Sequence, residues 1–193
     1  MRHRFIKRVV AIAALLLITA FFCVGTISAG TKPNCCVQKP TQKTVIPSYN
    51  SKANEAKLCY YATTYADYYG VERELVYAII WHETKWNPLA TSNVGAQGAM
   101  QLMPSTQRAY GVVQPYDISD NIGGGVAYLA DLMKQFHGDM RLALAAYYAG
   151  TKWVGKKGLS YNNPEVTKYV RDMRKLYNEQ LKHPGCHVRG TLK

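Results

Sequence analysis

The fold of this chain is decided by residues 75–88, which have the sequence LVYAIIWHETKWNP. Apolar side chains recur along this stretch at the three- to four-residue spacing that gathers them on one face of an α-helix. They are Leu75, Val76, Ile79 and Ile80. Glu83 lies four residues beyond Ile79 and therefore ends the apolar face with a carboxylate. We expect this carboxylate to be partly removed from water.

Partial burial of Glu83 has a chemical consequence. Removing a carboxyl group from water raises its pKa, because burial disfavours the charged form. A carboxylic acid that is still protonated at neutral pH can give its proton to the leaving oxygen of a glycosidic bond. On this helix alone, however, a structural role for Glu83 in an ion pair or a backbone cap is favoured, since such pairs also shift pKa values. The surrounding motifs decide between the two.

Helical spacing continues over most of the chain after about residue 53, whereas the alternation typical of β-strands is nearly absent. Glycines mark helix ends, and prolines mark helix starts. Besides the helix of Glu83, we predict helices that end at Gly70 and Gly138, one that begins at Pro104, and two over about Met140–Ala149 and Pro164–Leu181. The first of these places Cys59, Ala62, Ala66 and Tyr69 on its apolar face. The pattern predicts a single all-α domain of about five to seven helices.

The N-terminus has the order typical of a secretory signal peptide: basic residues, the apolar run Val9–Ile27, then small residues ending at Ala29. We predict a signal peptide over residues 1–29, a flexible linker over 30–52, the folded domain over 53–181 and a basic tail over 182–193. The apolar run is close to the length that spans a bilayer, so an uncleaved anchor is the alternative to cleavage. Both arrangements predict export to the periplasm or cell envelope.

The charge and the cysteines agree with export. The 193 residues carry a formal charge of +12; those after Ala29 hold 20 basic and 12 acidic side chains, a net charge of +8. This charge suits either an anionic cell envelope or simple solubility, and it is not organised into a nucleic-acid recognition motif.

A disulfide between Cys59 and Cys186 would join the two ends of the helical region; adjacent Cys35 and Cys36 pair elsewhere or with another chain. Sequence alone does not settle these pairings.

Several other chemistries are excluded by motif. His82-Glu83 begins a zinc protease motif that requires a second histidine at position 86, where this chain has Trp86. His183, Cys186 and His187 form a short terminal cluster of potential metal ligands, which we interpret as incidental. Neither a phosphate-binding loop nor a Gly-x-Ser-x-Gly nucleophile motif is present in the sequence.

Five short motifs, taken in order, resemble the soluble lytic transglycosylase catalytic domain. They are Glu83-Thr84-x-Trp86-Asn87-Pro88, Ser92-x-Val94-Gly95-Ala96-x-Gly98-Ala99-Met100-Gln101-x-Met103-Pro104, Asn121-Ile122 with Tyr128-Leu129, Ala145-Ala146-Tyr147-Tyr148-Ala149-Gly150, and Tyr169-Val170. The resemblance covers about residues 55–178. It implies a lysozyme-like helical domain of the goose type with a groove for a glycan strand.

The resemblance also implies roles for individual residues. Glu83 matches the catalytic glutamate of the family, and Tyr147 matches the tyrosine set close to it. Ser92, Gly98, Met100 and Gln101 match the sugar-contacting loop, Tyr128 and Tyr169 match aromatic groove positions, and Glu165 matches a second glutamate that binds peptidoglycan. Two positions depart from the family pattern: Thr84 replaces a serine and keeps its hydroxyl, whereas Tyr148 replaces an asparagine whose hydrogen bonds a phenol cannot copy.

The resemblance implies that Glu83 acts as a single acid and base. It cleaves the bond between N-acetylmuramic acid and N-acetylglucosamine in peptidoglycan, and the muramoyl C6 hydroxyl closes a 1,6-anhydro ring. This chemistry needs no cofactor, and we expect a monomer that serves wall remodelling for a secretion, pilus, conjugation or phage system. A hydrolase is the alternative and requires a second carboxylate, such as Asp117 or Asp120. A weakly active peptidoglycan-binding module is the other alternative, motivated by Tyr148.

Overall fold

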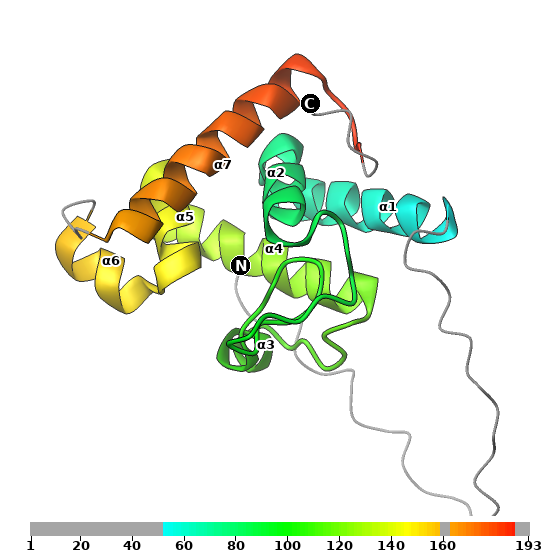
Figure 1. Ribbon diagram of the computed structural model, residues 1–193, viewed down its shortest axis with the longest axis horizontal. Helices are drawn as coiled ribbons and strands as arrows, with labels where there is room; N and C mark the ends of the chain where they lie inside the picture. The colour runs from blue at the N-terminus through cyan, green and yellow to red at the C-terminus, as the bar shows by residue number, and fades with distance from the viewer. Residues whose placement is uncertain (1–51, 159–162, 188–193) are drawn as a thin grey trace, which may run out of the picture. The chain divides into compact units, whose positions relative to one another are not determined.

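The computed structural model describes residues 52–158 and 163–187, with the side chains of Lys156 and Lys157 left out. These residues fold into seven helices and contain no named strand (Figure 1). The helices are α1 (Lys52–Tyr69), α2 (Arg73–Thr84), α3 (Pro104–Ala109), α4 (Ile118–Gln135), α5 (Met140–Ala149), α6 (Thr151–Lys157) and α7 (Pro164–Lys182). The all-α prediction is confirmed. The signal peptide and most of the linker lie outside the described residues.

The helix boundaries follow from local chemistry. The side chains of Asp117, Asp139 and Asn163 each accept hydrogen bonds from backbone N–H groups in the first turn of α4, α5 and α7 respectively. Pro164 is the first residue of α7, where its missing N–H costs nothing. Helix α6 begins directly after Gly150, so the chain resumes a helix where the sequence predicted only an end.

The hydrophobic core is built around helix α2. Leu75, Val76, Ile79 and Ile80 are buried, as their spacing predicts. Helix α2 packs against α1 and α7, α4 packs against α1 and α5, and α5 also contacts α6 and α7. On α1 the prediction was partly wrong: Leu58 is buried, whereas Tyr69 is exposed and Cys59 is only partly buried. The arrangement leaves the C-terminal end of α2 against α7, where Glu83 lies.

A disulfide joins Cys59 on α1 to Cys186, which follows α7. This pairing confirms the interpretation that a bridge ties the ends of the helical region together. Such a bond persists in oxidising compartments outside the cytoplasm. Separately, none of the described helices is long and apolar enough to cross a membrane.

Candidate active site

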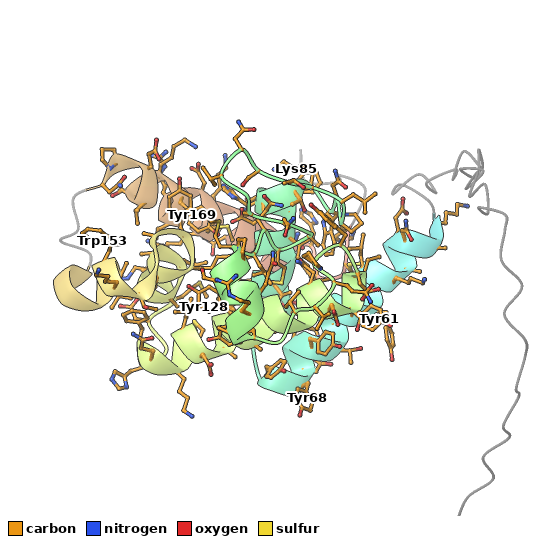
Figure 2. All side chains as sticks on the ribbon, turned by 90° about the horizontal axis from the view of Figure 1, so that it is seen from below. Tyr61, Tyr68, Lys85, Tyr128, Trp153 and Tyr169 are labelled. Atoms are coloured by element: carbon orange, nitrogen blue, oxygen red, sulfur yellow. A yellow bond between two sulfur atoms is a disulfide. The ribbon has the colours of Figure 1, made fainter. Side chains whose placement is uncertain are left out.

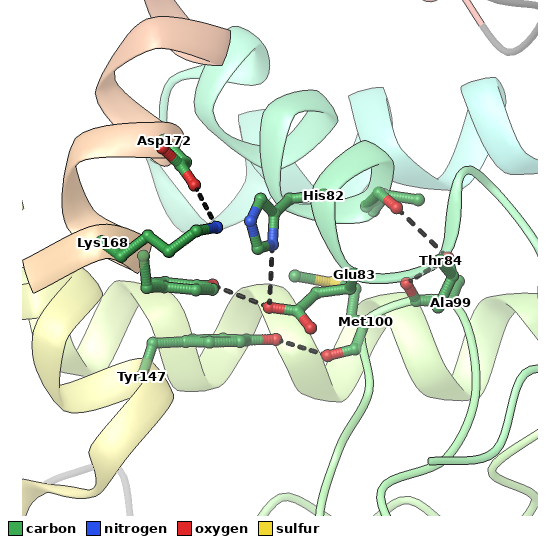
Figure 3. A network of polar contacts seen from close by, with 10 residues as sticks. His82, Glu83, Thr84, Ala99, Met100, Tyr147, Lys168 and Asp172 are labelled. Carbon is green, nitrogen blue, oxygen red and sulfur yellow. Dashed lines mark hydrogen bonds and ion pairs between the residues drawn. The ribbon is translucent and has the colours of Figure 1, made fainter. Parts of the chain in front are cut away.

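Glu83 lies on the last turn of α2, and its side chain is 18% exposed. Its Oε1 accepts a hydrogen bond of 2.8 Å from the hydroxyl of Tyr169 on α7. The Nδ1 atom of His82 lies 4.0 Å from the same oxygen (Figure 3). Oε2 has no hydrogen-bond partner among residues 52–158 and 163–187. The two carboxyl oxygens therefore differ, because only Oε1 accepts a hydrogen bond from a described residue.

Burial is the largest influence on this carboxyl group and raises the pKa of Glu83. The hydrogen bond from Tyr169 and the charge of Lys85 act in the opposite direction, but they do not cancel the effect of burial. The prediction that Glu83 is partly desolvated is confirmed. An acid with a raised pKa keeps its proton to higher pH, which suits proton donation.

His82 does not neutralise Glu83 by forming a strong ion pair. Burial lowers the pKa of His82, and the nearby charge of Lys85 lowers it further. The imidazole is therefore neutral at pH 7, and its buried Nδ1 has no hydrogen-bond partner among the described residues. At 4.0 Å, the approach to Glu83 is also too long for a hydrogen bond. An ion pair between His82 and Glu83 therefore does not explain the position of Glu83.

Buried Tyr169 and partly buried Tyr147 lie near the carboxyl group and come from different helices. Burial and the charge of Glu83 raise the pKa of both Tyr147 and Tyr169 well above 10.0. Both hydroxyls are therefore protonated donors at neutral pH. Tyr169 donates to Glu83, whereas Tyr147 donates a 2.8 Å hydrogen bond to the backbone carbonyl of Met100 (Figure 3).

The loop that carries Met100 is fixed by Asn121 of α4. The Asn121 amide accepts from the Met100 N–H and donates to the Gln97 carbonyl. Gly98 has φ +78°, and an added Cβ would lie 2.2 Å from the Asn121 amide, so only glycine fits this approach. The hydroxyl of Thr84 donates to the Ala99 carbonyl and ties the end of α2 to the same loop.

The sequence of residues 60–170, more than half of the chain, matches the family model described as the Transglycosylase SLT domain. The chain belongs to this family. A transglycosylase of Enterobacteria phage PRD1 is 43% identical over 96 residues, which are 48% of this chain and 36% of the phage protein. The membrane-bound lytic murein transglycosylase F of Desulfosudis oleivorans is 38% identical over 91 residues, 44% of this chain and 20% of the relative. The chain thus spans between a fifth and about a third of these relatives.

Solved structures of the family share the fold. The lytic transglycosylase Slt of Pseudomonas aeruginosa, solved as an inactive mutant, superposes with a TM-score of 0.56 at 27% identity. That superposition covers 72% of this chain and 26% of the other. The 70 kDa soluble lytic transglycosylase of Escherichia coli gives a TM-score of 0.54 at 24% identity, over 68% of this chain and 25% of the other. The latter match concerns the fold alone.

The other residues predicted from the SLT-domain motifs differ in where their side chains lie and what they contact. Ser92 and Gln101 bond within their own loop: the Ser92 hydroxyl accepts from Ala96 N–H, and the Gln101 amide donates to the carbonyls of Ala90 and Gly98. The Met100 side chain is buried, and an added Cβ on Gly125 would lie 2.5 Å from its sulfur. Its backbone carbonyl accepts the hydrogen bond from Tyr147.

The aromatic positions also differ from one another. The ring of Tyr128 lies 5.2 Å from that of Tyr147, and its hydroxyl donates to the Ala146 carbonyl. Tyr169 is only 3% exposed, so it contacts Glu83 from the interior. Glu165 is exposed on the first turn of α7 and accepts a 3.4 Å hydrogen bond from Tyr148. Sequence reasoning assigned no role to Asn121 or His82, although Asn121 belongs to a quoted motif.

The two carboxylates that the sequence offered for a hydrolase both accept hydrogen bonds from the backbone. Asp117 caps α4, and Asp120 accepts from the backbone N–H groups of Val113 and Gln114. The terminal metal cluster is also incomplete, because Cys186 is bonded to Cys59. Within the described part of the chain, no three His, Cys, Asp or Glu side chains are grouped as metal ligands would be.

Proposed function

We propose that this protein is a lytic transglycosylase that cleaves the β-1,4 bond between N-acetylmuramic acid and N-acetylglucosamine in peptidoglycan. The observation that carries the proposal is Glu83, a largely buried acid with Oε1 held by Tyr169 and Oε2 free of protein partners among the described residues. Membership of the SLT-domain family supports the substrate and the reaction type.

In the proposed first step, Glu83 donates the proton on Oε2 to the glycosidic oxygen. The bond between the muramoyl C1 and that oxygen breaks, N-acetylglucosamine leaves as an alcohol, and positive charge develops at C1. Glu83 becomes a carboxylate. The Tyr169 hydrogen bond favours this charged form, because it is made to the carboxylate oxygen, and so it assists proton release.

In the proposed second step, the same carboxylate takes the proton of the muramoyl C6 hydroxyl. The C6 oxygen bonds to C1 and forms the 1,6-anhydro ring, which restores protonated Glu83 and consumes no water. One carboxylate therefore suffices, whereas most glycosidases place two across the bond. The engagement of Asp117 and Asp120 in helix and loop capping supports this reaction over hydrolysis.

The wider setting is proposed from the sequence together with the disulfide. Residues 1–29 export the protein, residues 30–52 tether it, and the domain works on the wall in the periplasm, where the Cys59–Cys186 bond is stable. We propose that the enzyme acts as a monomer in local wall opening for an envelope-spanning secretion or pilus assembly. Ser92, Gly98, Met100, Gln101, Tyr128, Tyr147, Glu165 and Tyr169 are proposed to line or support the glycan site.

The test is digestion of purified sacculi with the mature protein and with Glu83→Gln, followed by mass spectrometry of the soluble muropeptides. The proposal predicts anhydro-muropeptides from the wild type alone. Products heavier by one water would instead establish a hydrolase. Sacculus binding with no released product would establish a binding module.

A further inference from the structure

Tyr148 lies against the aromatic partner of Glu83. Its ring stacks on that of Tyr169 with a centroid distance of 4.7 Å and an interplanar angle of 29°. Tyr148 belongs to α5 and Tyr169 to α7, so the stack joins two helices beside the acid. An asparagine at position 148 has no ring and could not make this contact.

The ring of Tyr169 is held by two neighbours from different helices. Tyr148 lies against its face, and the ring of His82 from α2 meets it edge-on at 4.9 Å and 81°. Both arrangements are favourable geometries for aromatic pairs. The hydroxyl of the ring held in this way is the one that donates to Glu83 Oε1. The orientation of Tyr169 therefore depends on both rings, of which His82 also approaches the Glu83 carboxyl group.

Tyr148 is anchored at its outer end. Its hydroxyl donates a 3.4 Å hydrogen bond to Glu165 Oε2 on the first turn of α7, and the residue is 47% exposed. The contact is long and exposed, so it contributes less than the buried stack. The ring, more than the hydroxyl, should therefore determine what Tyr148 does.

We propose that Tyr148 is a positioning residue for the transglycosylase reaction, whose ring holds the Tyr169 hydroxyl against Glu83. The inference rests on the proposed function and names a residue that acts on Glu83 only through Tyr169. Activity then depends on an aromatic ring at position 148.

The test compares Tyr148→Ala with Tyr148→Phe, which keeps the ring and removes only the hydroxyl. Activity is measured as release of anhydro ends from soluble, uncrosslinked peptidoglycan strands. Tyr148→Ala should lower kcat about two- to tenfold with KM unchanged, the range expected for one aromatic pair. Tyr148→Phe should restore kcat to within about twofold of the wild type. Tyr68→Ala, which removes a 77% exposed tyrosine of α1, is the matched control.

A second readout is independent of activity. Titration of the Glu83 carboxyl by ¹³C NMR should give a higher midpoint in Tyr169→Phe, because the hydrogen bond that lowers this pKa is lost. Tyr148→Ala should shift the midpoint in the same direction by a smaller amount. In the Tyr169→Phe background, Tyr148→Ala should add little to either readout, since the two residues act as a unit.

The outcomes separate the inference from the proposed function. Absence of anhydro product from the wild type contradicts the function, and the NMR midpoints then still decide whether Tyr148 positions Tyr169. Wild-type kcat and midpoint in Tyr148→Ala overturn the inference alone. A raised KM with unchanged kcat also overturns it, because Tyr148 would then be a surface for the substrate. Equal loss in Tyr148→Phe and Tyr148→Ala would assign the effect to the contact with Glu165.

Discussion

Two groups of tyrosines in this chain share a residue type and differ in what surrounds them. Figure 2 labels Tyr61 of the first group and Tyr169 of the second. The α1 row consists of Tyr61, Tyr65 and Tyr69, and the site group consists of Tyr147, Tyr148 and Tyr169. Rings of the α1 row follow one another at 6.0 and 6.4 Å along a single helix. Those of the site group come from α5 and α7 and surround a carboxyl group.

The difference lies in the partner that each hydroxyl finds. In the α1 row, the Tyr65 hydroxyl bonds to the Ser119 hydroxyl at 2.9 Å, a neutral contact between α1 and α4. In the site group, the Tyr169 hydroxyl bonds to Glu83, whose pKa burial has raised. In the proposed reaction, this phenol has a chemical role because an acid is buried beside it. The phenol of Tyr65 on α1 makes only a neutral hydrogen bond.

The largest expected effect comes from removing that acid. Glu83→Gln should lower anhydro-muropeptide release about 10²- to 10⁴-fold, the range for loss of a general acid. The substitution should not lower the thermal stability of the protein. A carboxyl whose pKa is raised by folding destabilises the protein above the ordinary pKa of the group, so Gln should raise Tm more at pH 8 than at pH 4. Muropeptide analysis measures the loss of activity, and thermal melts of both proteins at the two pH values measure the change in stability. A Tm of Glu83→Gln below that of the wild type at pH 8 would contradict the claim that burial raises the pKa of Glu83.

The next largest effect is expected on the free energy of unfolding, with the catalytic rate unchanged. The Cys59–Cys186 bond closes a loop with a sequence separation of 127 residues at the α1 side of the molecule. Replacing both cysteines by serine should lower the free energy of unfolding by about 2–5 kcal/mol. Denaturant titration measures this loss. As long as the variant is folded, its kcat should stay within about twofold of the wild type. A much larger fall in kcat would show that the region around the disulfide contributes to the active site.

The comparison is sharpest when both groups receive the same substitution. Tyr169→Phe removes the hydroxyl that bonds to Glu83 and should lower kcat about tenfold or more, because hydrogen bonds to charged groups are the stronger ones. It should also move the alkaline limb of the pH–activity profile upward, since loss of this bond raises the pKa of Glu83. A downward shift of that limb would contradict the assignment.

Tyr65→Phe makes the identical change in the α1 row and should have the smallest effect. Loss of the bond to Ser119 should cost about 1 kcal/mol of stability and change kcat by less than about twofold. Melting and activity measurements on both Phe variants test the contrast directly. Equal losses of kcat would mean that the partner of each hydroxyl does not distinguish the two groups.

Local sequence patterns predicted every described helix except α6, and also the burial of Glu83, because these features depend on spacing along one helix. The bounds of α5 and the apolar face of α2 were predicted for this reason. The bond between Tyr169 and Glu83 could not be predicted in this way, since it depends on how α7 packs against α2 across 86 residues. Family resemblance placed Tyr169 near the substrate but did not identify it as the donor to Glu83.

Three further features of the structure could not be predicted from local sequence patterns. Helix α6 follows Gly150 directly and had no separate periodic pattern to identify it. Asn121 is buried in the middle of polar loop contacts, and only the folded loop shows that its amide fixes both Met100 and Gln97. Tyr148 appeared in the sequence as a departure from the family, and its stack on Tyr169 becomes visible only when α5 and α7 are placed together.

The central claim is that burial raises the pKa of Glu83, so that the carboxyl group keeps its proton to higher pH and can act as an acid. The most direct test is the titration of its carboxyl carbon by ¹³C NMR in the full chain, with Glu83→Gln used to assign the resonance. The account predicts a midpoint above the ordinary value of 4.5. A midpoint at or below that value would show that Glu83 is an ordinary carboxylate and would contradict the claim.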